Sequence, residues 1–166
     1  MHYVEQFSTW LKGTQLSWAV LHYTWVWPAC ESLHFIGMAF LIGIVGLLDL
    51  RILGLGKGMP IGMVHRLLPW GIAGFVVNLI TGALFFAGDP FQYVHNPAFQ
   101  FKMLFIAVAG VNVLLFYGSG ALAKAEALGP AEDAPMAAKL IAGFSLAIWI
   151  AVMYCGRMLP YLGNAF

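Results

Sequence analysis

Four long apolar stretches dominate the chain, and each is separated from the next by a short polar or glycine-rich segment. A helix needs about 20 residues to cross the hydrocarbon of a bilayer, and each of the four stretches is longer than that. The expected transmembrane helices cover about residues 28–53, 63–87, 97–123 and 136–159. The pattern predicts an all-α integral membrane protein, a four-helix bundle that forms a single transmembrane domain over residues 1–166.

The segment of about residues 3–25, ahead of the first span, is too polar to cross a membrane. Val4, Phe7, Trp10 and Leu11 recur at helical spacing, with polar residues between them. Several tryptophans and tyrosines then gather just before the first span, as is typical of a membrane interface. We therefore expect an amphipathic helix that lies in the interface.

Composition places the chain in a bilayer. Of its 166 residues 61% are hydrophobic and 9% are charged, and the mean hydropathy is +0.84. Soluble domains carry roughly 25% charged residues. A net charge of +1 excludes the broad basic surface that nucleic-acid binding requires. The expected partners are membrane lipid and, because 19 glycines favour close helix packing, further copies of the chain.

The basic residues predict an orientation. Five of the eight flank the first and third loops: Arg51, Lys57, Arg66, Lys124 and Lys139. The other three belong to the opposite side: Lys12, Lys102 and Arg157. Loops rich in Lys and Arg stay in the cytoplasm, so we expect the first and third loops there and both termini on the outer side of the membrane.

Alternating helices bring the start of the first span, the end of the second, the start of the third and the end of the fourth to one side. Most of the ionisable residues that are candidates for a functional site lie on that side: His22, Glu31, His34, Asp89, His95, Lys102 and Arg157. His34 lies roughly 9 Å along the first span. Ionisable groups at such depth are costly and indicate a functional site.

Two imidazoles on one side of a helical bundle suggest axial ligation of haem. A neutral imidazole binds iron through one ring nitrogen while a nearby acceptor fixes its other N–H. We expect haem b between His34 and His95, with Glu31 supporting a ligand and Lys102 and Arg157 pairing with the propionates. His22 and His65 are further candidate ligands.

Two other interpretations stay open. Copper is favoured by imidazole and thioether ligands, which His22, His34 and His95 would provide together with Met38 or Met153. Alternatively, the chain is a cofactor-free oligomeric scaffold or anchor subunit, in which the histidines are ordinary hydrogen-bonded residues and Arg157 reaches the interface.

Other polar residues carry less specific signals. Asn78 and Asn112 lie in the middle of spans, where hydrogen bonds between helices are the expected role. A disulfide between Cys30 and Cys155 stays open, although two unbonded cysteines are the favoured interpretation, and the chain has no CxxCH sequence for covalent haem attachment. HExxH, GxSxG and Walker sequences are also missing, so no hydrolase or nucleotide site is indicated.

The motifs W-P-x-x-E-x-x-H, D-L-R-x-L-G, L-P-W-x-x-x-G-F, T-G-x-x-x-F and Y-x-x-N, the last followed by F-x-x-K, run along nearly the whole chain. They are carried by Trp27, Pro28, Glu31, His34, Asp49, Leu50, Arg51, Gly54, Leu68, Pro69, Trp70, Thr81, Gly82, Tyr93, His95, Asn96, Phe99 and Lys102. The string resembles a family of small bacterial four-helix inner-membrane proteins of unknown function. That family often ends its third helix in Phe-His, whereas this chain has Phe116-Tyr117.

More loosely, the architecture resembles four-helix b-type cytochromes, which hold haem between helices on histidine ligands. This resemblance implies electron transfer between a quinone or another membrane partner and an acceptor on the outer side.

Overall fold

The computed structural model describes residues 2–129 and 132–162 and is built from helices alone within those ranges. The helices are α1 His2–Lys12, α2 Gln15–His22, α3 Val26–Leu53, α4 Ile61–His65, α5 Leu68–Gly88, α6 Pro90–Val94, α7 Pro97–Gly118, α8 Ala121–Glu126 and α9 Met136–Leu162. Segments long and apolar enough to cross a bilayer are Val26–Leu53, Ile61–Gly88 (α4 with α5), Pro97–Gly118 and Met136–Leu162. The expected all-α bundle of four spans is confirmed, and the protein is a multi-pass membrane protein.

Local backbone conformation and capping hydrogen bonds explain where the helices begin and end. α3 stops at Gly54, whose φ of 108° is the left-handed conformation that glycine adopts without strain. Asn96 caps α7 by accepting a hydrogen bond from the Ala98 N–H at 2.9 Å. The Asn96 amide also donates to the Leu159 carbonyl at 2.8 Å, which ties the start of α7 to the end of α9.

Two expected boundaries are wrong. The third span was expected to reach residue 123, but α7 ends at Gly118 because Gly120 turns the chain with a φ of 67° before α8 begins. The single interfacial helix expected over residues 3–25 is two helices. The break falls at Gly13, and the Thr14 hydroxyl caps α2 by accepting from the Ser17 N–H at 3.3 Å.

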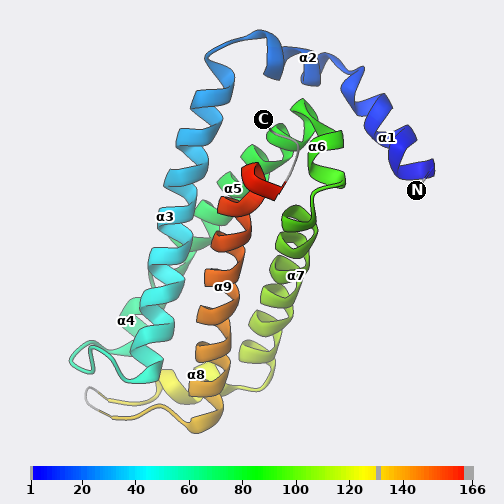
Figure 1. Ribbon diagram of the computed structural model, residues 1–166. Helices are drawn as coiled ribbons and strands as arrows, with labels where there is room; N and C mark the ends of the chain where they lie inside the picture. The colour runs from blue at the N-terminus through cyan, green and yellow to red at the C-terminus, as the bar shows by residue number, and fades with distance from the viewer. Residues whose placement is uncertain (1, 130–131, 163–166) are drawn as a thin grey trace.

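By their contacts, the four spans form an open row in the order α5, α3, α9, α7. In Figure 1, α5 runs behind α3. α3 packs extensively against α5 and against α9, and α9 packs against α7. Within the described residues, α5 and α7 make hardly any contact with each other, so the row does not close into a ring. The arm formed by α1 and α2 lies at the end of the bundle that carries α6, and it packs on α5 and α6.

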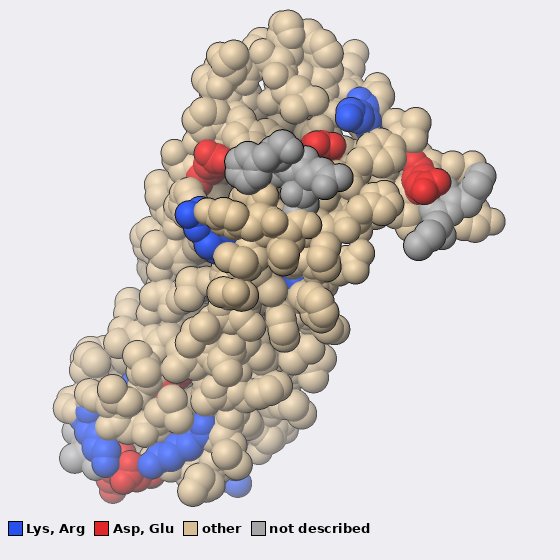
Figure 2. All heavy atoms as spheres, viewed as in Figure 1, with Lys and Arg blue, Asp and Glu red and all other residues tan. Residues whose placement is uncertain are grey.

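The best-packed core is at the opposite end, where α4 and α8 close the bundle. Its largest buried members are Leu48, Ile52, Ile61, Val64, Phe116 and Leu122. By contrast, the outward faces of the spans carry exposed large apolar side chains, as lipid-facing surfaces do. On the face in Figure 2, charged side chains gather mainly towards the two ends of the molecule, with a largely uncharged belt between them.

Candidate functional site

His34 lies in α3 at the level of Thr81 in α5. His34 follows the start of α3 by eight residues, and Thr81 precedes the end of the antiparallel α5 by seven. The His34 Nδ1 and the Thr81 Oγ1 are 2.7 Å apart. The Thr81 hydroxyl also donates its single hydrogen to the Val77 carbonyl at 2.7 Å. Nδ1 of His34 must therefore be the donor to Thr81, which leaves the Nε2 of His34 with a free lone pair.

Aromatic and small residues surround this imidazole. The Phe85 ring lies edge-on to His34 with centroids 5.7 Å apart, and Trp27 lies 5.0 Å from Phe85. A Cβ added at Gly82 would sit 3.9 Å from the His34 Cε1. The ring thus lies among apolar groups against α5, beside Gly82, which has no side chain.

The acceptor that supports His34 is Thr81 and not the expected Glu31. Glu31 is exposed and accepts a hydrogen bond from the Trp27 indole at 3.1 Å. Burial raises the pKa of Tyr93 to about 12, with contributions from Asp89 and then from Glu31. The negative charges of these carboxylates therefore disfavour ionisation of Tyr93.

Lys102 extends from α7 towards α9. Its ammonium nitrogen lies 3.6 Å from where a Cβ would be on Gly156. Among the described residues, no hydrogen bond or ion pair engages this half-buried cation. An uncompensated lysine within a membrane span favours an anionic ligand.

His95 ends α6 and is exposed. Its Nδ1 lies 3.1 Å from the Phe91 carbonyl oxygen, which has no hydrogen to give, so Nδ1 donates and Nε2 remains free. Within the described residues, no hydrogen bond or ring contact joins His95 to His34.

The remaining expected residues are engaged elsewhere. Arg157 donates to the Tyr161 hydroxyl at 3.5 Å on its own helix and lies over that ring. His22 stacks on Trp18, with centroids 4.2 Å apart.

His65 differs from the other candidate ligands because both of its ring nitrogens are occupied. Nδ1 lies 2.6 Å from Glu126 Oε1, and Nε2 lies 2.8 Å from the Tyr117 hydroxyl. These contacts join α4, α7 and α8 at the far end of the bundle. His65 has no lone pair left for a metal.

The His, Cys, Asp and Glu side chains within residues 2–129 and 132–162 are potential metal ligands. No group of three or more His, Cys, Asp or Glu side chains lies close enough to hold a metal ion there. Cys30 and Cys155 are both buried and unbonded, as expected.

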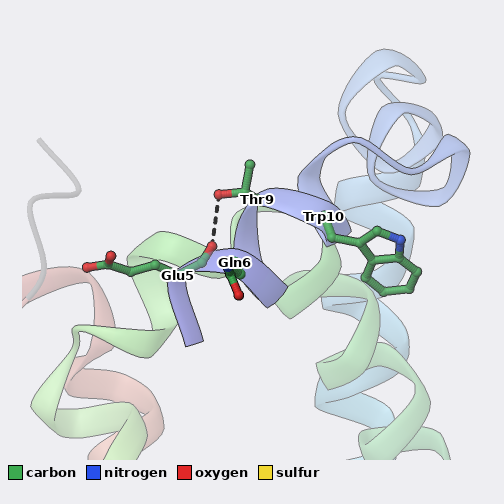
Figure 3. A pocket seen from close by; sticks show the side chains of 4 residues that line it. All are labelled: Glu5, Gln6, Thr9 and Trp10. Atoms are coloured by element: carbon green, nitrogen blue, oxygen red, sulfur yellow. Dashed lines mark hydrogen bonds between the residues drawn. The ribbon is translucent and has the colours of Figure 1, made fainter. Parts of the chain in front are cut away.

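A surface hollow lies on the arm. It is lined by Glu5, Gln6, Thr9 and Trp10 of α1 (Figure 3). The Thr9 hydroxyl is already used in a 2.8 Å hydrogen bond to the Glu5 carbonyl. Its open, shallow form and the single helix that lines it make it a poor candidate for a specific site.

Sequence reasoning identified His34, His95 and Lys102 but missed Thr81. One signal in the sequence could have indicated Thr81. This residue lies in α5, which runs antiparallel to α3, at the same depth in the membrane as His34. Asn78 and Asn112 do form the expected bonds between helices: Asn112 donates to the Ile141 carbonyl at 3.3 Å, and the Asn78 amide meets the α3 backbone. No family model, curated protein or solved structure matches the chain.

Proposed function

We propose that the protein binds haem b through His34 and His95 and carries electrons between a membrane-soluble reductant, such as a quinone, and an acceptor at the arm end. The observation that supports this proposal is the hydrogen bonding of the two imidazoles. Each gives its Nδ1–H to a neighbouring oxygen and keeps its Nε2 lone pair free, which is the state a metal ligand needs. His65, with both nitrogens engaged, lacks that state.

The residues around His34 fit the remaining parts of a haem. Lys102 is a cation without an ion-pair partner among the described residues, as a propionate would require, and Arg157 lies near the same end of α9. Phe85 and Trp27 provide apolar contacts, and Gly82 places no side chain beside the ring. Haem supplies one-electron chemistry when bound, and the chain's own part is to hold it and shield it from water.

The absorption spectrum of protein purified from haem-replete cells tests the proposal. We expect a Soret band that is lost in His34→Ala and His95→Ala. His65→Ala is the matched control and should keep the band, because His65 binds only Glu126 and Tyr117. A wild-type preparation without a Soret band would overturn the proposal.

The cofactor-free scaffold is the second candidate, and the tie between His34 and Thr81 favours it. A hydrogen-bonded histidine between two helices also serves packing alone. In that case His34→Ala would lower stability and leave colour and metal content unchanged. Metal analysis of the same samples separates haem from copper.

We further propose that the protein resides in a bacterial inner membrane as a homo-oligomer, with α4 and α8 on the cytoplasmic side and both termini in the periplasm. The excess of basic residues at the end of α4 and α8 supports this orientation.

A further inference from the structure

Helix α5 holds residue 34 at two points. Thr81 fixes the ring, as described above. One turn earlier, the Asn78 side-chain amide meets the α3 backbone. We assign its orientation from the neighbouring donor and acceptor: its nitrogen then donates to the His34 carbonyl at 2.7 Å, and its oxygen accepts from the Met38 N–H at 3.1 Å. In an α-helix these two backbone groups belong to the same i to i+4 pair. Asn78 therefore bridges the turn of α3 that carries His34.

Two glycines make this approach possible. A Cβ on Gly37 would lie 2.7 Å from the Asn78 amide and 2.8 Å from the Gly74 carbonyl oxygen. A Cβ on Gly74 would lie 2.6 Å from the Gly37 carbonyl oxygen. The backbones of α3 and α5 are thus in direct contact, and a side chain at either position would push the Asn78 amide away from α3.

We propose that Asn78 is a positioning residue for His34, acting together with Thr81 to present the Nε2 of His34 in one fixed place. This inference rests on the proposed ligand role of His34. The Thr81 contact sets the tautomer and the rotation of the ring. The Asn78 contact sets the register of α3 against α5. A slip of one residue moves a helix about 1.5 Å, which is more than a hydrogen bond tolerates.

The simpler reading is that Asn78 only holds two helices together, and Asn112 provides the control for it. Asn112 is also a membrane asparagine that donates to a carbonyl of a neighbouring helix, but it joins α7 to α9 and has no contact with His34. If both asparagines serve packing alone, Asn78→Leu and Asn112→Leu should have the same effects on His34.

The first measurement needs no haem. In protein with isotope-labelled histidine, reconstituted in lipid, solid-state NMR reports the tautomer of each ring, and His34→Ala assigns the signal. We expect His34 to be Nδ1-protonated in the wild type, to lose that preference in Thr81→Val, and to show several signals in Asn78→Leu. Asn112→Leu should keep the wild-type signal. If Asn78→Leu does not fold, Asn78→Ser replaces it, since serine is too short to bridge both groups.

The second measurement is haem binding. Loss of a group that orients a metal ligand weakens binding about 10- to 100-fold, so Asn78→Leu and Thr81→Val should raise the dissociation constant by that factor. Asn112→Leu should bind haem like the wild type. Equal tautomer signals and equal affinities in Asn78→Leu and Asn112→Leu would overturn the positioning role. A wild-type protein that binds no haem would overturn the proposed function instead, and the NMR result would still decide the role of Asn78.

Discussion

At the scale of single residues, what distinguishes the histidines is the atom that each leaves free. His34 and His95 keep Nε2 free, whereas His65 shares both nitrogens with Glu126 and Tyr117. The sequence places a histidine near a membrane surface in each case, but it contains no information on ring contacts. Those depend on how neighbouring helices are rotated.

The backbone contact between α3 and α5 gives a prediction at this scale. Gly74→Ala would put a Cβ 2.6 Å from the Gly37 carbonyl oxygen and 3.0 Å from the Leu41 nitrogen, both of them backbone atoms that cannot turn aside. We expect a loss of about 1–3 kcal/mol in the free energy of unfolding, the usual cost of overpacking. Chemical unfolding in detergent measures it. Gly110→Ala is the control, because nothing lies within 4 Å of its added Cβ. Equal stability of the two variants would contradict the tight contact.

At the scale of elements, Asp133 connects two loops at the end of the bundle that carries α4 and α8. Its Oδ1 lies 3.0 Å from the ammonium of Lys57, in the loop between α3 and α4, and 3.0 Å from that of Lys139 in α9. Hydrogen bonds from Lys57 and then from Lys139 lower the pKa of Asp133 below its ordinary value. The carboxylate form is therefore favoured in the folded state.

A pH dependence follows from that direction. A lowered carboxyl pKa contributes stability above the pKa of the unfolded chain, about 3.9, and the contribution is lost as the pH falls through the folded value. We expect the thermal midpoint of the wild type to fall in this acidic range by more than that of Asp133→Asn. The difference should shrink at high salt, because this carboxylate is exposed. Parallel pH profiles for the two proteins would contradict the link.

At the scale of the whole molecule, the four spans form an open row, and both described ends of the chain lie on the side of the arm (Figure 1). The orientation proposed above gives a prediction for this arrangement. Alkaline phosphatase is active only in the periplasm, so we expect an active enzyme when it is fused after α9 and an inactive one when it is inserted in the loop between α3 and α4. A fluorescent protein that folds only in the cytoplasm should give the opposite pattern at both sites. The reverse result at both sites would contradict the proposed orientation and support the opposite one.

The sequence alone determined the membrane class, the four spans and the positions of His34, His95 and Lys102. These follow from local composition, because a segment in lipid must satisfy its own backbone and be apolar enough to stay there. Even the boundaries that were wrong, at Gly13 and Gly120, fell at glycines visible in the sequence.

Only the tertiary structure decided what each polar group contacts. Thr81 rather than Glu31 supports His34, Asn78 bridges the backbone of α3, and Arg157 turns to its own helix. The contacts of His34 and Asn78 depend on the rotation and depth of neighbouring helices, which are set by a few close contacts such as Gly37 with Gly74. Hydrophobic periodicity in a span that is apolar on all sides does not specify that rotation.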